Sequence, residues 1–169
     1  MPTDIAIRFA GTDDINIIGF LAQQIWPSTY KKILSEEQLN YMMNLFYSPG
    51  SLQEQMIDKK HSILIVEENE EPIGFASYST IDEPGIYKIH KIYVLPDQQG
   101  KGLGKLVINF IIDNIKESGA RALQLNVNRY NKAKFFYEKL GFEVIREEDV
   151  DIGNNYFMND YVMEKKLNR

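Results

Sequence analysis

The chain has 169 residues, 44% of them hydrophobic, so it can bury one sizeable core, and its length predicts a single domain over residues 1–169. The formal net charge of -5 and the sequence pI of about 5.1 argue against a general nucleic-acid-binding protein. Cysteine is absent, which excludes disulfides, thiolate zinc sites and a cysteine nucleophile, and two histidines make a histidine metal cluster unexpected. There is no apolar run near the roughly 20 residues of a membrane span and no basic-then-apolar leader, so we expect a cytoplasmic protein that does not enter the membrane.

Hydrophobic periodicity and turn residues predict alternating helices and strands, with no repeat and no low-complexity linker. Thr12 is a good N-cap for a first helix, and the segment around Pro27 is expected to be a loop that ends it. Ser35 and Gln38 follow the capping-box rule and predict the start of a second helix. Strands are predicted over residues 5–9, 62–67, 72–81, 86–94, 123–127, 142–148 and 156–165, and helices over 13–24, 36–46 and 51–59, over a segment containing 106–115, and between 131 and 141.

The segment from Val94 to Lys105 predicts a strand end, a short loop and a glycine-rich turn that opens a helix. Pro96 stops the strand pairing because proline has no amide hydrogen to donate. The amides of such a turn and the positive end of the helix dipole favour an anion, and phosphate is the usual occupant. Gly102 and Gly104 would let the backbone approach its ligand without an intervening side chain. The alternative is a solvated loop whose glycines serve only the turn.

Residue spacing separates this turn from two common nucleotide-binding motifs. Val107 stands where the dinucleotide pattern GxGxxG needs its third glycine, and no GxxxxGK[ST] occurs in the chain. The segment Gln99–Gly104 instead resembles the [QR]-x-x-G-x-[GA] signature of the GNAT acyltransferase superfamily, whose turn amides hold the pyrophosphate of acetyl-coenzyme A (acetyl-CoA). The resemblance implies acetyl-CoA as the acyl donor, bound by Gln99, Gly100, Lys101, Gly102, Leu103, Gly104 and Lys105.

A second segment, from Asn128 to Phe142, resembles the block N-x-(x)-A-x-x-x-Y-x-x-x-G-F that follows the fifth strand of the same family. Asn131 is a plausible N-cap for its helix, and Gly141 is a natural left-handed stop. The resemblance implies that Tyr137 protonates the thiolate leaving group; the alternative is a tyrosine that merely faces the core. It also implies that Asn131 binds the coenzyme, with Asn128 as the competing asparagine and helix capping as the purely structural alternative.

The resemblance implies the GNAT acyl-CoA N-acyltransferase fold. This is an α/β fold with a central mixed, mostly antiparallel sheet flanked by helices, and its fourth and fifth strands splay apart. A backbone amide of the fourth strand commonly polarises the acetyl carbonyl in this family. By resemblance, that role falls to the main chain of Ile92, Tyr93 and Val94.

The general base is where the sequence departs from part of the family. Many members carry a glutamate about 11 residues before the pyrophosphate motif, but Lys88 stands there and cannot accept a proton while charged. His90 lies two residues on, nominally on the same strand face, and titrates in the useful range, so it is the best single candidate. A histidine without a role is the alternative, and Asp82 or Glu83 acting through water is another, so the base stays unassigned.

The sequence indicates the identity of the acceptor less clearly than that of the coenzyme. Trp26 and Tyr30 flank the proline and are the candidates for substrate binding, although most aromatic side chains are expected in the core. Acidic residues could attract a cationic amine, or they form an ordinary solvated face. The layout is similar to small bacterial polyamine and general amine acetyltransferases.

We therefore expect acetyl transfer to a primary amine of a small molecule such as a polyamine, by direct attack in a ternary complex. The alternatives are acetylation of a protein N-terminus or lysine, and a non-catalytic acetyl-CoA-binding module of the same fold. Members of the family are often dimers, so a homodimer is a further expectation.

Overall fold

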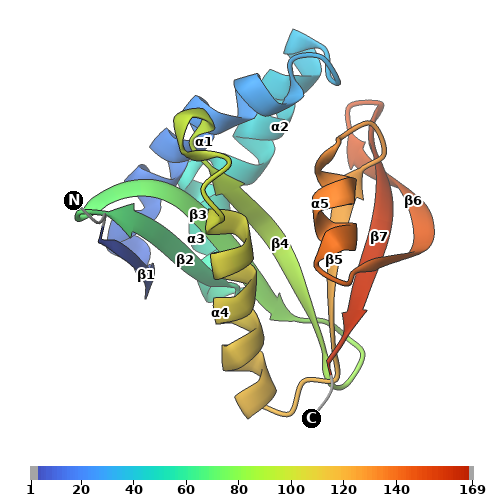
Figure 1. Ribbon diagram of the computed structural model, residues 1–169. Coiled ribbons are helices and arrows are strands. Elements are labelled where there is room, and N and C mark those ends of the chain that lie inside the picture. The colour runs from blue at the N-terminus through green and yellow to red at the C-terminus, as the bar shows by residue number, and fades with distance from the viewer. Residues whose placement is uncertain (1–3, 168–169) are drawn as a thin grey trace. The chain divides into compact units, whose positions relative to one another are not determined.

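The computed structural model describes residues 4–167. Seven strands in this part of the chain form one mixed sheet in the order β1-β2-β3-β4-β5-β7-β6 (Figure 1). Strands β4 and β5 run parallel, and the pairs β1–β2, β2–β3, β5–β7 and β6–β7 are antiparallel. The predicted mixed, mostly antiparallel sheet flanked by helices is therefore confirmed.

The strands are β1 (Ile5–Phe9), β2 (Ser62–Glu68), β3 (Glu71–Thr80), β4 (Ile86–Val94), β5 (Ala122–Asn128), β6 (Glu143–Gly153) and β7 (Tyr156–Lys166). The helices are η1 (Thr12–Asp14), α1 (Ile15–Tyr30), α2 (Glu36–Tyr47), α3 (Pro49–Ile57), η2 (Pro96–Gln98), α4 (Leu103–Glu117) and α5 (Ala133–Lys139), with η marking 3-10 helices.

The chain divides into two compact units. The first comprises the described part of Met1–Ser79 together with Lys91–Ile108, and the second comprises Thr80–His90 with the described part of Asn109–Arg169. Strand β4 begins in the second unit and ends in the first, whereas α4 begins in the first and ends in the second. The single acetyltransferase domain over residues 1–169 stays a prediction.

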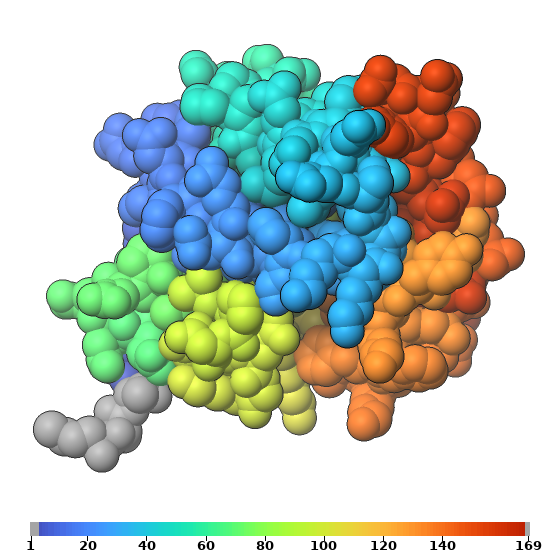
Figure 2. Space-filling model, turned by 90° about the horizontal axis from the view of Figure 1, so that it is seen from above, coloured from blue at the N-terminus to red at the C-terminus, as the bar shows by residue number. Residues whose placement is uncertain are grey.

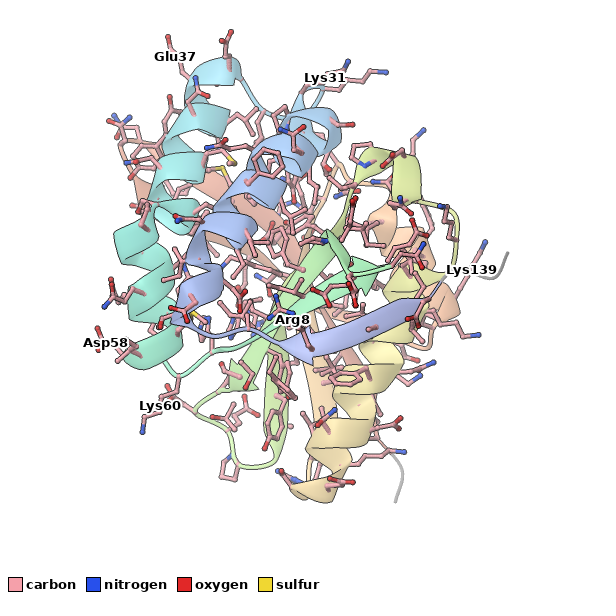
Figure 3. All side chains as sticks on the ribbon, turned by 90° about the vertical axis from the view of Figure 1, so that its left-hand side faces the viewer. Arg8, Lys31, Glu37, Asp58, Lys60 and Lys139 are labelled. Carbon is pink, nitrogen blue, oxygen red and sulfur yellow. The ribbon has the colours of Figure 1, made fainter. Side chains whose placement is uncertain are left out.

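In the first unit, helices α1, α2 and α3 lie side by side (Figure 1). They pack on the sheet face from which Phe75 and Tyr93 project, because rings of α1 and α2 contact both side chains. Arg8 of β1, labelled in Figure 3, bonds to Asp14 at 2.9 Å and to Glu67 at 3.1 Å. These contacts tie the edge strand to η1 and to β2.

In the second unit, α5 covers one face of β5 and β7 (Figure 1). The Nζ atom of Lys134 on α5 lies 5.2 Å from the ring centroid of Tyr161 on β7. Leu123, Phe142 and Met163 are almost fully buried and form part of the core of this unit. Because strand side chains alternate between faces, Tyr161 marks the face of β7 that is turned toward α5.

The predicted break at Pro27 was wrong, and Trp26 and Tyr30 do not flank a loop: α1 continues to Tyr30. Proline lacks only its own amide hydrogen, and its carbonyl still accepts a hydrogen bond from the Lys31 amide at 3.0 Å. The last two turns are also held by packing, since Ile25 and Trp26 are buried. Tertiary burial therefore outweighs the local cost of the proline.

Most other boundaries lie within two residues of the predictions, but β6 extends to Gly153, five residues beyond its predicted end at 148. Strands β1 and β4 have the predicted limits, and the Ser35 hydroxyl caps α2 by accepting the Gln38 amide at 3.1 Å. Thr12 opens the 3-10 turn η1 rather than α1, so its predicted capping role was wrong. Helix α3 begins two residues early, because Ser48 caps it and Pro49 occupies its first turn.

Candidate functional site

The glycine turn joins β4, through η2, to α4 in the first unit. Gly100 and Gly102 have φ values of 84° and 77°, in the left-handed region that favours glycine. The Leu106 amide donates to the Gly102 carbonyl at 3.1 Å, which makes Gly102 the residue just before the helix. The amides of the next residues lie in the first helical turn, where the helix itself offers no acceptor.

The turn has room for a ligand on its exposed side. A Cβ atom built at Gly100 or Gly102 would meet nothing within 4 Å. Residues near 100 are exposed on the face shown in Figure 2, where they are yellow-green. First-turn amides and an uncovered backbone suit an anionic group such as a pyrophosphate, so the residues present fit the predicted ligand.

Side chains anchor this turn to the end of β2. Lys101 donates to the side-chain oxygen of Gln98 at 2.8 Å and lies 3.9 Å from the Glu68 carboxylate, and Gln98 in turn contacts Glu68 at 3.4 Å. Lys101 was predicted to bind the coenzyme, and its ammonium already has these two partners. These contacts link the turn to β2, and coenzyme binding by Lys101 stays a prediction.

The end of β4, with Ile92, Tyr93 and Val94, is held from two sides. The Tyr93 hydroxyl lies 2.9 Å from the Tyr30 hydroxyl, and its ring lies 5.7 Å from those of Trp26 and Phe75. On the neighbouring strand β3, the Ile73 carbonyl accepts the Leu95 amide at 2.9 Å. These contacts fix the main-chain segment that the resemblance assigns to the acetyl carbonyl.

The two predicted acceptor-binding residues lie in the first unit's aromatic core. Trp26 and Tyr30 are 4% and 9% exposed, and their ring centroids are 4.7 Å apart. Their direct contacts are with other aromatic side chains, Tyr93 among them. We therefore assign both to positioning the end of β4, and their direct contact with an acceptor stays a prediction.

A polar group around Lys91 was missed by the sequence reasoning. The Lys91 ammonium donates to the side-chain oxygen of Gln55, a residue that is 5% exposed, and lies 5.4 Å from the centroid of the Tyr47 ring. Burial, with a smaller contribution from Lys59, lowers the pKa of Lys91 to about 8. Burial, assisted by Lys91 and Lys59, also lowers the pKa of His61 to about 4, so this imidazole is neutral near pH 7. The only sequence signal was a glutamine at an apolar helical position.

The second motif lies wholly in the second unit. The Asn131 side chain accepts the Ala133 amide at 2.9 Å, and Asn128 accepts the Tyr130 amide at 2.9 Å. The N-cap of α5 is Lys132, one residue after the predicted Asn131, and its side chain does not cap the helix. Gly141 has a φ of 96° and ends the helix in the left-handed conformation that was predicted. Both asparagine oxygens thus already accept backbone amides. Any coenzyme contact must use their remaining hydrogen-bonding capacity.

Tyr137 occupies the predicted position on α5 and is 8% exposed. Its ring centroid lies 5.2 Å from that of Phe136 and 6.0 Å from that of Phe142. The ring is therefore fixed by aromatic neighbours, which a phenol needs in order to present its proton in one direction. The same packing would serve a core residue, so the catalytic role stays a prediction.

Lys88 and His90 lie two residues apart on β4, in the second unit. The parallel pairing of β4 with β5 matches Lys88 with Gln124 and extends to Ile89 and Leu125, one residue before His90. Burial lowers the pKa of Lys88, and Glu148 and Asp160 act on it in the opposite direction. Lys88 thus lies near carboxylates of β6 and β7, and no sequence motif indicates this neighbourhood.

The remaining candidates for the base, Asp82 and Glu83, are exposed and precede the start of β4. Within residues 4–167 no group of three or more histidine, aspartate or glutamate side chains could hold a metal ion. In the same part of the chain no helix is both long enough and apolar enough to cross a membrane.

Comparison with known proteins agrees with these observations. The family model for the acetyltransferase (GNAT) family matches residues 17–142. The ribosomal protein bS18-alanine N-acetyltransferase of Haemophilus influenzae is 33% identical over 138 residues, which are 81% of this chain and 87% of that protein. The spermidine N(1)-acetyltransferase of Thermoplasma acidophilum is 28% identical over 96% of this chain and 97% of its own.

Solved structures give the same result. The crystal structure of PaiA N-acetyltransferase from Thermoplasma acidophilum in complex with coenzyme A superimposes with a TM-score of 0.82. It shares 27% sequence identity, and the match covers 97% of this chain and 99% of that one. The chain belongs to the acetyltransferase (GNAT) family, and it is an N-acetyltransferase that uses acetyl-CoA as acyl donor.

Proposed function

We propose that this acetyltransferase acts on a primary amine of a small molecule such as a polyamine. The observation that carries the proposal is the likeness to the spermidine N(1)-acetyltransferase, because it extends over almost the full length of both chains. The net charge of -5 supports a cationic acceptor, which an acidic protein attracts over distance.

We propose direct attack of the amine while both substrates are bound. Acetyl-CoA supplies an activated acetyl group as a thioester. The turn at Gly100 and Gly102 would bind its pyrophosphate, and the main chain at Tyr93 and Val94 would donate a hydrogen bond to the acetyl carbonyl. Tyr137 would hold the proton for the leaving thiolate, because a phenol pKa of about 10 is close to that of a thiol.

The acceptor amine must lose a proton before it can attack. We propose His90 for this step, since imidazole titrates near neutral pH and His90 projects from the same strand as Lys88, where many relatives carry a glutamate. Lys88 cannot take this role while it is charged.

A second candidate is acetylation of a protein N-terminus. It is favoured by the 33% identity to the bS18-alanine enzyme, which exceeds the 28% to the spermidine enzyme. The two candidates differ in what surrounds the reacting nitrogen: a flexible multiply charged chain in one case and a peptide backbone in the other.

A thiol-release assay with acetyl-CoA and a panel of acceptors tests the proposal. The panel contains spermidine, a monoamine of similar length, single amino acids and a peptide beginning with alanine. We expect the highest kcat/KM for spermidine. Faster release with the alanine peptide would favour the second candidate and reject the first. A homodimer and a cytoplasmic location stay predictions.

A further inference from the structure

One face of the second unit carries a row of polar side chains. Tyr161 faces α5, so its neighbour Asp160 projects from the opposite face of β7. Asn128 pairs with Asp160, and Gln124 with Glu164, so the even-numbered residues of β5 share this face. Lys88 joins the row through its pairing with Gln124. The face is nevertheless not open to solvent at its centre, because Asp160 and Gln124 are each 3% exposed.

The orientation of the Asn126 amide leaves one acceptor without a donor. Its Nδ2 atom donates to Asp160 Oδ2 at 3.2 Å, and a hydrogen bond from Asn126 also helps to lower the pKa of Glu148. Because a carboxylate only accepts, the amino side of the amide must face these two acids. The Oδ1 atom is then turned away from them, and it is buried with no hydrogen-bond partner among residues 4–167.

The Asp160 carboxylate can also accept further hydrogen bonds. Within residues 4–167 the side-chain carboxylate of Asp160 accepts one hydrogen bond, from Asn126, although a carboxylate can accept about four. Its neighbour Glu148 is bound to Arg146 at 3.0 Å, and Glu164 to Gln124 at 3.0 Å. Burial raises the pKa of Asp160 and the nearby Lys88 lowers it, so the charged carboxylate would gain from a further cation.

The Asn126 amide and the Asp160 carboxylate are joined by one hydrogen bond, and each has an oxygen that can accept another; the amide oxygen has no donor among residues 4–167. Such acceptors match a ligand rich in N–H groups. A primary ammonium has three such donors and a positive charge, whereas a carboxylate or phosphate ligand has none. We propose that Asp160 and the Oδ1 atom of Asn126 form the subsite that binds a primary ammonium group of the acceptor. This deepens the proposed function and rests on it for the identity of the acceptor.

The test is calorimetric titration of spermidine into the full chain in the presence of coenzyme A. Asp160→Asn keeps the shape of the side chain and removes its charge, and we expect it to weaken spermidine binding by about ten-fold or more. Asp149→Asn is the matched control, since Asp149 is 60% exposed, lies on the adjacent strand β6 and pairs with Arg129. The control should bind spermidine as the wild type does.

A second variant tests the amide oxygen itself. Asn126→Ala removes Oδ1 and leaves the Asp160 carboxylate, and we expect about five-fold weaker binding. Thermal melting of each variant establishes that it is folded. In the coupled assay, Asp160→Asn should raise the KM for spermidine while kcat and the KM for acetyl-CoA stay within about three-fold.

The outcomes separate the two proposals. Wild-type spermidine affinity in folded Asp160→Asn would overturn the subsite even if the enzyme acetylates spermidine. Loss of binding in Asp160→Asn, with no acetyl transfer by the wild type, would keep the ammonium subsite and reject the proposed reaction.

Discussion

The carbonyl oxygen of Tyr93 lies so close to Gly74 that a Cβ atom at Gly74 would stand 2.7 Å from it. The same Cβ would be 2.9 Å from Cγ1 of Val94 and 3.2 Å from its Cα atom. Two of these three atoms are backbone, so they cannot turn aside as a flexible side chain would. The missing side chain on β3 thus allows the end of β4 to lie where it does.

Gly74→Ala should therefore displace the main chain at Tyr93 and Val94. We expect a loss of about 1–3 kcal/mol in the free energy of unfolding, as for other overpacked sites. If this segment polarises the acetyl carbonyl, kcat falls as well. Urea denaturation and the thiol-release assay measure the two effects.

Gly50→Ala is the control for this substitution. A Cβ atom there meets nothing within 4 Å, and Gly50 lies in the first turn of α3. Alanine should be neutral or stabilising by up to about 1 kcal/mol at such a position. Equal stability of both variants would show that the close approach at Gly74 carries no cost.

Tyr137→Phe tests the proposed proton donor. The ring and its contacts with Phe136 and Phe142 are kept, so the fold should be unchanged. We expect kcat to fall by about 10-fold or more, within the range of an acid–base group, with the Kd for acetyl-CoA unaltered. Tyr130→Phe is the control, because Tyr130 lies in the same motif and is 71% exposed. Full turnover by Tyr137→Phe would leave Tyr137 as a core residue.

The sequence predicted most of the fold because its signals are local. Several features depend only on residues that are close in sequence: the limits of β4, the Ser35 cap and the Gly141 stop. The continuation of α1 through Pro27 depends instead on the burial of Trp26 and Tyr30 against distant strands. No periodicity within the helix reports that contact.

The site was predicted unevenly for the same reason. The glycine turn is a backbone feature, and a short motif determines it. The Asp160–Asn126 contact joins residues 34 positions apart, and it depends on the register of β5 against β7. The only sequence signals were an asparagine within an apolar strand and an aspartate beside a tyrosine. Neither signal predicts which residue the side chain contacts.

Gly102→Ala tests the turn as the pyrophosphate site. Alanine at a φ of 77° is strained by about 1–2 kcal/mol, and relief of that strain moves the first amides of α4. We expect the Kd for acetyl-CoA, measured by calorimetry, to rise by about ten-fold. Gly119→Ala is a closely matched control. Gly119 has a φ of 84°, lies just beyond the other end of α4 and also has nothing within 4 Å of a Cβ atom. A similar Kd in both variants would exclude the turn from coenzyme binding.

The pair His61 and Lys91 predicts how stability depends on pH. The folded-state pKa of His61 is about 4, below the ordinary value of 6.5. Between these values the unfolded chain binds more protons than the folded one, so the free energy of unfolding falls as pH decreases from about 6.5 to about 4. Lys91 contributes to this depression through its charge, after burial.

Lys91→Met should raise the pKa of His61 and make the acid loss of stability less steep. Burial is the larger cause, so the pKa should stay below its ordinary value. Imidazole proton shifts followed by NMR report it directly, and His90→Gln assigns the signals because the chain has two histidines. Lys60→Met removes a charge from an exposed neighbouring residue, labelled in Figure 3, and should leave the pKa of His61 unchanged. An unaltered His61 pKa in Lys91→Met would show that the charge of Lys91 plays no part in keeping this imidazole neutral.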